Sequence, residues 1–211
     1  RVLLATKFGA HADTVVTAQN QVYAMPDGMS FEEAAALPVN YLTAWHMLFA
    51  VAGLRPGNSV LIHMAAGGVG IAVLQLCRTV EDVTTYGTSS PGKHDLIREQ
   101  GCDHAIDYRS LDYAAEVRRL TGGRGVDIVL DALGGDDWKK GYELLAPAGK
   151  LVAFGFANMA SGNKRNLFTI AKQFLSIPKW SPMNLMDTNR LVAGVNMGHL
   201  WSEVELLRVE M

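Results

Sequence analysis

The amino-acid sequence predicts an α/β fold in which a parallel sheet is doubly wound, with helices on both of its faces. From Ser59 onward, short apolar runs alternate with helical patterns, and this alternation is typical of parallel sheets. The first apolar run leads through a glycine-rich turn at 65–70 directly into a helical pattern. This order of strand, turn and helix places free backbone N–H groups where they can bind a diphosphate.

The segment before Ser59 is predicted to start with two β-like runs and to continue as a helix in two parts. Ser30 and Glu33 have the spacing of a capping box, in which each side chain bonds the backbone N–H of the other residue. Proline removes a backbone donor from a helix interior, so Pro38 is expected to break the helix. The predicted β-like runs are 1–8 and 14–23, and the predicted helical parts are 32–37 and 42–52.

From residue 60 on, the alternation predicts six strands and the helices that follow them. The predicted strands are 60–64, 83–86, 104–107, 126–130, 150–154 and 191–195. The predicted helices are 70–80, 93–100, 113–120, 138–145 and 167–175. Their lengths fit crossover connections between parallel strands.

Composition excludes several classes of function. The chain of 211 residues is 49% hydrophobic and 19% charged and has a net charge of −2, which is an ordinary globular balance. Its basic residues form no stripe of the kind that binds nucleic acid, and no run of about 18 apolar residues predicts a membrane-spanning helix. Cys77 and Cys102 are too few for a disulfide framework, which favours a reducing compartment. The six histidines are scattered, so no metal site is predicted.

The glycine-rich turn is a variant of the dinucleotide-binding pattern G-x-G-x-x-G, with Ala65 in place of the first glycine. Gly67 and Gly68 are expected to let the backbone approach a pyrophosphate, and Gly70 to let the helix pack closely on the strand. The substitution Gly68→Asp is therefore expected to abolish dinucleotide binding and to leave the fold intact. The alternative is a tight turn in an α/β core that binds nothing.

The cofactor expected at this turn is NADP(H) rather than NAD(H). Folds that bind NAD place a carboxylate about 20 residues after the glycines, where it holds the ribose hydroxyls. The corresponding segment, 86–93, contains no carboxylate, whereas Ser89, Ser90 and Lys93 suit a 2′-phosphate. The alternative for Lys93 is a solvated residue at a helix start.

Several motifs resemble the medium-chain dehydrogenase/reductase superfamily, and the A-A-G-G-V-G form of the turn is similar to its quinone oxidoreductase branch. The motifs are 42–45, 56–57, 60–70 and 126–131 with Gly134. A closer likeness is to a synaptic-vesicle membrane branch of the superfamily. The segments that carry it are 31–37, 63–70, 75–81 and 164–167.

The resemblance implies a dinucleotide-binding Rossmann domain over residues 30–200. Residues 1–29 would be the C-terminal part of a β-rich, GroES-like catalytic domain, and 201–211 a truncated start of the return to that domain. The chain is therefore expected to be a fragment that is inactive as a reductase on its own. At full length the resemblance implies a homodimer, located in the cytoplasm or peripherally on vesicle or mitochondrial outer membranes.

The resemblance also implies a set of cofactor-binding residues. Those of the pyrophosphate loop would be Gly67, Gly68 and Val69. Those at the adenosine phosphate end would be Gly87, Ser89, Lys93 and Tyr108. Those near the nicotinamide would be Thr43, Leu133, Phe154, Gly155 and Val195. The alternatives are an ordinary strand-end residue for Tyr108 and a hydroxyl bonded to its own backbone for Thr43.

The function that the resemblance implies is an NADP(H)-dependent, zinc-independent oxidoreductase that transfers hydride to a quinone or an α,β-unsaturated carbonyl. Zinc-dependent relatives place a ligand near 38–40, where this chain has no Cys, Asp or Glu. No catalytic residue can be named. The alternative is a non-catalytic nucleotide-binding adaptor at vesicle or mitochondrial membranes. The mixed basic and apolar segment 166–180 could lie on a membrane, although a crossover helix packed on the sheet is the preferred interpretation.

Overall fold

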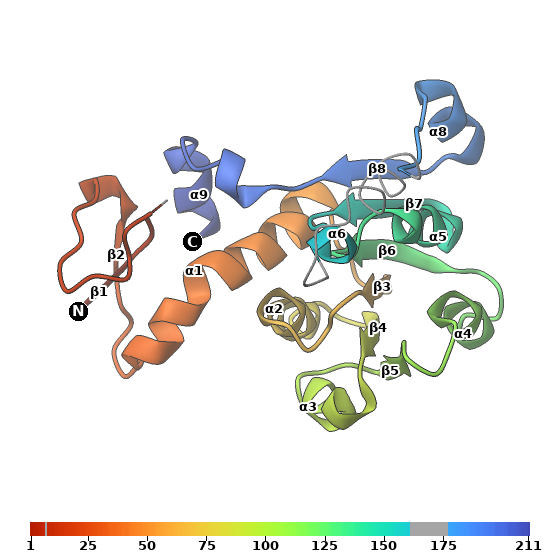
Figure 1. The fold of residues 1–211 in the computed structure, drawn as a ribbon, viewed down its shortest axis with the longest axis horizontal. Helices are drawn as coiled ribbons and strands as arrows, with labels where there is room; N and C mark the ends of the chain where they lie inside the picture. Colours follow the sequence, from red (N-terminus) through yellow and green to blue (C-terminus); the bar gives the residue numbers. More distant parts are fainter. Residues whose placement is uncertain (7, 161–176) are drawn as a thin grey trace.

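The structure is a computed structural model that describes residues 1–6, 8–160 and 177–211. The predicted helix 167–175, the motif 164–167 and most of 166–180 lie outside the described residues. Figure 1 shows a large sheet with helices on both sides, and a small two-stranded sheet at the far end of a long helix. That long helix, α1 (Phe31–Trp45), connects the two parts.

The large sheet has six strands in the order β5-β4-β3-β6-β7-β8, and every neighbouring pair is parallel. The strands are β3 (Ser59–Ile62), β4 (Thr84–Ser89), β5 (His104–Asp107), β6 (Val126–Asp131), β7 (Leu145–Ala153) and β8 (Leu191–Gly194). The predicted doubly wound parallel sheet is confirmed. The strand order reverses between β3 and β6, and folds of this kind bind ligands outside the carboxyl ends of the strands at such a reversal.

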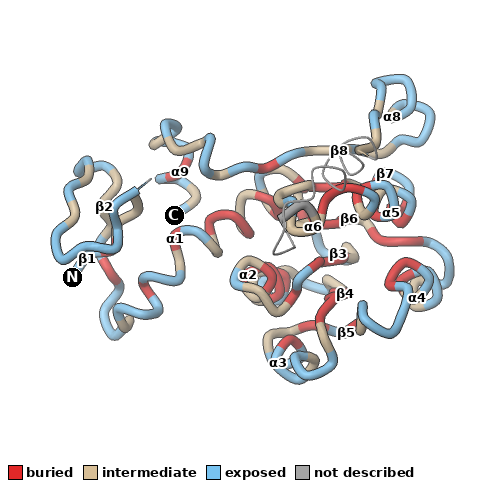
Figure 2. Tube along the Cα trace, viewed as in Figure 1, coloured by how far each residue is buried: buried red, intermediate tan, exposed pale blue. Residues whose placement is uncertain are grey.

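Helices cover both faces of this sheet because successive strand residues point to opposite sides. On one face, Val60 and Ile62 pack with residues of α1, α2 (Gly68–Cys77) and α3 (His94–Glu99). On the other face, Leu61 packs with residues of α4 (Tyr113–Leu120), and Trp138 of α5 (Asp136–Glu143) belongs to the same hydrophobic cluster. The most deeply buried residues accordingly follow the strands and their flanking helices (Figure 2).

Further short elements complete the described chain. They are β1 (Val2–Leu4), η1 (Gln19–Gln21), β2 (Val22–Ala24), η2 (His46–Val51), η3 (Pro91–Lys93), α6 (Ala157–Ala160), α8 (Pro182–Thr188), η4 (Met197–His199) and α9 (Val204–Glu210). The strands β1 and β2 pair antiparallel and lie beside α9 (Figure 1). The long β-like runs predicted at 1–8 and 14–23 are therefore wrong in extent, because each forms a strand of three residues only.

The helix α1 confirms the predicted capping box and corrects the predicted break. The Glu33 amide donates to Ser30 Oγ at 3.1 Å, and the Ser30 amide donates to Glu33 Oε2 at 2.8 Å. The helix then continues through Pro38 to Trp45 instead of breaking. Pro38 removes one backbone hydrogen bond, but it lies on the buried face together with Leu42, so packing of that face outweighs the loss.

Together α1 and η2 form one helical segment, Phe31–Val51, that is long and apolar enough to cross a membrane by length and composition. A single segment of this kind is a weak indication, because core helices of globular proteins meet the same criteria. Here Ala44, Met47 and Leu48 are buried in the core against the strands. The sequence predicts no membrane-spanning helix, whereas the structure contains one weak candidate. The C-terminal half of this candidate packs on the sheet.

Candidate cofactor-binding site

A cleft with a volume of about 710 Å³ opens at the carboxyl ends of β3, β4, β5 and β6. We call it the switch-point cleft because it lies beside the reversal in strand order. Its lining residues are His63, Met64, Ala66, Gly67, Thr88, Ser89, Ser90, Lys93, Tyr108, Arg109, Leu111, Asp112, Tyr113, Leu133, Asp137, Lys140, Ala157 and Asn158. The position is the one that a doubly wound sheet offers to a ligand.

The glycine-rich turn between β3 and α2 forms one wall of the cleft. The Gly67 amide donates to the Met64 carbonyl at 2.8 Å, and the Ala65 amide donates to the Thr88 carbonyl at 3.0 Å, so the turn is fixed at both ends. Gly67 is the N-cap residue of α2 and makes no side-chain cap bond. The first N–H groups of a helix lack intrahelical partners, so this N-terminus can accept an anion from the cleft.

The three glycines of the turn have different surroundings. A Cβ at Gly70 would lie 2.6 Å from the carbonyl oxygens of Met64 and Ala65, which is the close packing that the sequence predicts. A Cβ at Gly68 would lie 2.6–2.7 Å from the side chain of Asn40 on α1. Gly68→Asp would therefore disturb the packing of α1 against α2 as well as any bound anion, and Gly67 is the glycine that lines the cleft.

Four of the predicted residues meet at the end of the cleft formed by β4, η3 and β5. Ser89, Ser90, Lys93 and Tyr108 all line it. The sequence prediction missed a second cation there, Arg109, whose guanidinium carbon lies 6.0 Å from the centre of the Tyr108 ring. The sequence does contain a signal for Arg109, because this basic residue directly follows the predicted site residue Tyr108.

The remaining predicted residues lie outside the lining of the cleft, with Leu133 as the exception. The hydroxyl of Thr43 donates to the Val39 carbonyl at 2.6 Å, so the alternative of a hydroxyl bonded to its own backbone is the one observed. A Cβ at Gly87 would lie 2.7 Å from Cys102 Sγ, which makes Gly87 a packing position beneath the turn. Other predicted residues that do not line the cleft are Gly68, Val69, Phe154, Gly155 and Val195.

Phe154, Gly155 and Val195 nevertheless share the carboxyl edge of the sheet. Phe154 and Gly155 directly follow β7, and Val195 directly follows β8. The Phe154 amide donates to the Asp131 carbonyl at 2.9 Å, and the Val195 amide donates to the Ala153 carbonyl at 2.9 Å. They extend the same edge away from the phosphate end, on the β7 and β8 side of the reversal.

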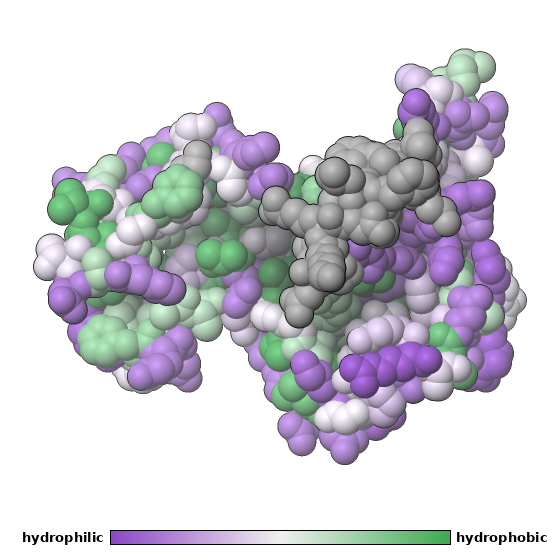
Figure 3. All heavy atoms as spheres, in the orientation of Figure 1, coloured by the Kyte–Doolittle hydropathy of each residue, from purple (hydrophilic) through white to green (hydrophobic). Residues whose placement is uncertain are grey.

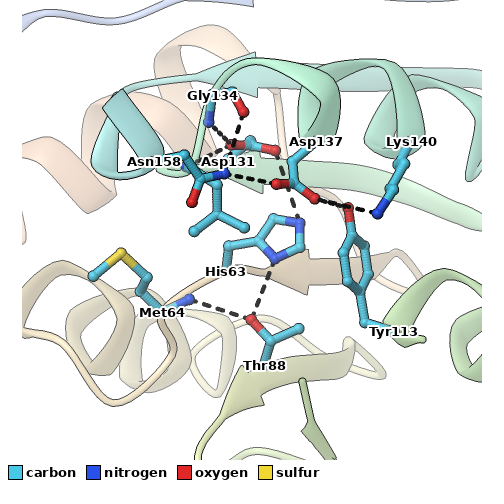
Figure 4. Close-up of polar contacts among 10 residues, drawn as sticks. His63, Met64, Thr88, Tyr113, Asp131, Gly134, Asp137, Lys140 and Asn158 are labelled. Carbon is cyan, nitrogen blue, oxygen red and sulfur yellow. Dashed lines mark hydrogen bonds and ion pairs between the residues drawn. The ribbon is translucent and has the colours of Figure 1, made fainter. Parts of the chain in front are cut away.

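A cluster of polar side chains that the sequence prediction missed lies between the turn and α5 (Figure 4). Asp137 accepts hydrogen bonds from the Tyr113 hydroxyl and from the side-chain Nδ2 of Asn158, both at 2.8 Å, and Lys140 Nζ lies 4.0 Å from it. Burial, followed by the nearby charge of Asp137, raises the pKa of Tyr113, so this phenol stays a hydrogen-bond donor. Tyr113 comes from α4, Asp137 and Lys140 from α5, and Asn158 from α6, so the fold brings three helices together at this point.

The described residues do not fit a catalytic zinc ion. Across 1–6, 8–160 and 177–211, no three His, Cys, Asp or Glu side chains are placed to hold a metal. In the segment 38–40, the side chain of Asn40 donates from Nδ2 to the Ala36 carbonyl at 3.3 Å and packs beside Gly68.

A larger groove, of about 1040 Å³, lies between α1, the two short strands β1 and β2, and α9. Its walls are mostly apolar, and Figure 3 shows apolar side chains in the hollow between the small sheet and the rest of the molecule. Leu37, Trp45 and Val22 are among its lining residues. Neither the glycine-rich turn nor the carboxyl ends of the parallel strands line it, so we assign the nucleotide to the switch-point cleft.

Comparison with known proteins finds relatives that match almost the whole chain. Residues 68–208 match the sequence profile of the protein family described as zinc-binding dehydrogenase. The Synaptic vesicle membrane protein VAT-1 homolog of Danio rerio is 53% identical over 98% of this chain and 43% of its own length. The chain spans about half the length of the curated relatives it matches.

Solved structures give the same result. The human synaptic vesicle membrane protein VAT-1 homolog-like protein is 39% identical, with a TM-score of 0.78 over 100% of this chain and 57% of that one. A quinone oxidoreductase of Pseudomonas syringae pv. Tomato DC3000 is 28% identical, with a TM-score of 0.73 over 90% of this chain and 54% of that one. The fold of this chain is thus the fold of medium-chain oxidoreductases, which implies a nicotinamide nucleotide cofactor.

Proposed function

Because this chain belongs to the zinc-binding dehydrogenase family, within the medium-chain dehydrogenase/reductase superfamily, we propose that it binds NADP(H) in the switch-point cleft. We further propose that the protein is a zinc-independent oxidoreductase that transfers hydride to a quinone or an α,β-unsaturated carbonyl. One observation carries the proposal. The N-terminus of α2 has no side-chain cap, and its N-cap residue Gly67 lines the same cleft as the cations Lys93 and Arg109.

The choice of NADP(H) over NAD(H) follows from the charges at the phosphate end. Lys93 and Arg109 can both donate charge-assisted hydrogen bonds to a 2′-phosphate. The two carboxylates that line the cleft are already engaged, since Asp112 accepts from the Ala114 amide at 3.0 Å and Asp137 accepts from Tyr113 and Asn158. Neither lies in the segment 86–93, where a carboxylate would hold the ribose hydroxyls of NAD.

The first test removes these cations. Lys93→Ala and Arg109→Ala should each weaken NADPH binding by about tenfold, because each removes one charged partner of the 2′-phosphate. NADH binding should change little, since NADH lacks that phosphate. Isothermal titration of both nucleotides against the wild-type chain and each variant measures the ratio.

Lys139→Ala is the matched control, because Lys139 is an exposed lysine of α5 that does not line the cleft. It should leave both affinities unchanged. An equal loss of NADPH and NADH binding in the Lys93 and Arg109 variants contradicts the NADP(H) assignment.

Hydride transfer is proposed from the resemblance and from the name of the quinone oxidoreductase relative. When bound, the nicotinamide supplies the hydride, and the chain's own residues position and shield it. Leu133 lines the cleft, and Phe154, Gly155 and Val195 extend the carboxyl edge where the ring would lie. Oxidation of NADPH by the full-length protein with a panel of quinones and enones tests this step.

The second candidate function is a nucleotide-binding adaptor at vesicle or mitochondrial membranes. It is favoured by the 53% identity to a protein named for the synaptic vesicle membrane. An adaptor would bind NADPH but would not oxidise it with any quinone or enone in that panel.

We also propose that the protein is a cytoplasmic homodimer with peripheral membrane contact. The exposed Leu191 on the edge strand β8 supports a contact between subunits there.

A further inference from the structure

Two loops that line the switch-point cleft leave neighbouring strands at the reversal in strand order. The turn 63–67 follows β3, and the loop 132–135 follows β6. Met64 and Gly67 of the first loop and Leu133 of the second line the cleft. A dinucleotide that spans the reversal must contact both loops at once, so their relative position decides how well it binds.

His63 is the first residue of the first loop, and its side chain is tied to the loop backbone through Thr88. The side chain of His63 is fully buried, and its Nδ1 lies 3.2 Å from Thr88 Oγ1. The same hydroxyl oxygen accepts the Met64 amide at 3.3 Å. His63 is therefore coupled to the backbone of the turn by one shared hydroxyl group (Figure 4).

Asp131 lies beneath the second loop and holds its backbone directly. Its Oδ1 accepts hydrogen bonds from the Leu133 amide at 2.6 Å and from the Gly134 amide at 3.0 Å. Its side chain is as completely buried as that of His63. A carboxylate that accepts two backbone N–H groups fixes the start of the loop.

The two side chains face each other across the boundary between β3 and β6. His63 Nε2 lies 3.8 Å from Asp131 Oδ2, and neither atom has another hydrogen-bond partner within the described ranges. If Thr88 donates its hydroxyl proton to Nδ1, the proton of the neutral imidazole lies on Nε2 and points at the carboxylate. A movement of less than about 1 Å would close this contact to an ordinary hydrogen bond.

Neighbouring groups keep the imidazole in this orientation. The ring of Tyr113 packs edge-on against it, with 4.7 Å between ring centres and an interplanar angle of 79°. The Tyr113 hydroxyl in turn donates to Asp137, which also accepts from Asn158. Burial lowers the pKa of His63 and raises that of Asp131, so the bridge does not depend on a protonated histidine.

We propose that His63 and Asp131 are positioning residues that lock the two cofactor-binding loops at a fixed spacing. We call the arrangement of Thr88, His63 and Asp131 the loop bridge. The inference rests on the proposed function, because the spacing matters only if one ligand spans both loops. The bridge sets the relative position of the two loops, and so acts on the affinity for the whole dinucleotide.

Asp131→Asn tests the bridge. The variant keeps an acceptor for the Leu133 and Gly134 amides and removes the charge that faces His63. NADPH should bind about tenfold more weakly, because the charge that faces His63 is lost and the spacing of the two loops is no longer fixed. The half-molecule 2′,5′-ADP should bind as it does to the wild type, because it reaches the phosphate end and the turn without reaching the second loop. Isothermal titration measures both ligands.

Asp127→Asn is the matched control. Asp127 lies on the same strand, and its Oδ2 accepts from the Ser59 amide and the Ser59 hydroxyl, both at 2.8 Å. It therefore bridges β3 and β6 at the edge opposite the cleft. A structural role alone would make the two substitutions equivalent, whereas the loop bridge requires that only Asp131→Asn weakens NADPH binding.

The possible outcomes separate this inference from the proposed function. Equal effects of Asp131→Asn and Asp127→Asn, or an equal loss of NADPH and 2′,5′-ADP, overturn the loop bridge while the proposed function stands. A wild-type chain that binds neither nucleotide overturns the proposed function and this inference with it. If Asp131→Asn melts below the assay temperature, His63→Leu gives the same comparison, because it removes the imidazole that faces Asp131.

Discussion

Gly67→Asp should weaken NADPH binding on the order of a hundredfold and leave the fold intact, because it places a negative charge where the pyrophosphate binds. Gly67 caps α2 with φ −84° and ψ 167°, a backbone conformation that any residue adopts, and aspartate is a favoured N-cap residue. Its Cβ would lie 3.2 Å from the Met64 carbonyl, which requires only a small adjustment. Fluorescence titration with NADPH measures the loss.

Gly67→Asn separates charge from size, since asparagine has the same shape and is an equally good N-cap residue. It should retain much of the affinity that the aspartate variant loses. Thermal unfolding of both variants should agree with that of the wild type to within a few degrees. If aspartate and asparagine weaken binding equally, the start of α2 is not the pyrophosphate site.

Gly70→Ala should lower the free energy of unfolding by about 3 kcal/mol, the upper end of what overpacking costs. A Cβ at this position would lie 2.6 Å from two backbone carbonyl oxygens, those of Met64 and Ala65. Backbone atoms of a fixed turn cannot rotate away as a side chain would, so the turn and α2 must separate. Urea unfolding followed by circular dichroism measures the change.

Gly92→Ala is the control for this stability prediction. Nothing lies within 4 Å of a Cβ built on Gly92, and its φ is not in the left-handed region. Its free energy of unfolding should stay within about 0.5 kcal/mol of the wild type. A Gly70→Ala protein as stable as Gly92→Ala would mean that the turn can relax, contrary to the close packing seen around Gly70.

The sheet could be predicted from the sequence because its signals are local and repeated. The predicted strand 104–107 and helix 113–120 agree with β5 and α4, and in α4 the buried residues Tyr113, Ala114 and Val117 recur at helical spacing. Pro38 was misleading because its local cost is small beside the burial of the helix face that carries it. The β-like runs near the N-terminus were too long because apolar composition alone does not supply a pairing partner.

The candidate site was predictable only where its residues are contiguous. The turn 65–70 and the segment 89–93 each lie in one stretch of sequence, and Gly67, Ser89 and Lys93 do line the cleft. His63 and Asp131 lie on strands that are adjacent only because β6 pairs with β3. No spacing rule in the sequence reveals that pairing, so the buried bridge between the two loops required the structure.

The tight packing around Gly87, which has no side chain, has an evolutionary consequence. A Cβ at that position would lie 2.7 Å from Cys102 Sγ and 2.9 Å from the Cβ of Ala65, so three positions on separate segments share one volume. A larger residue at any one of them is tolerated only if another shrinks. Positions 65, 87 and 102 should therefore covary among homologous sequences. A change to a larger residue at one of them should be removed by selection or accompanied by a change at another.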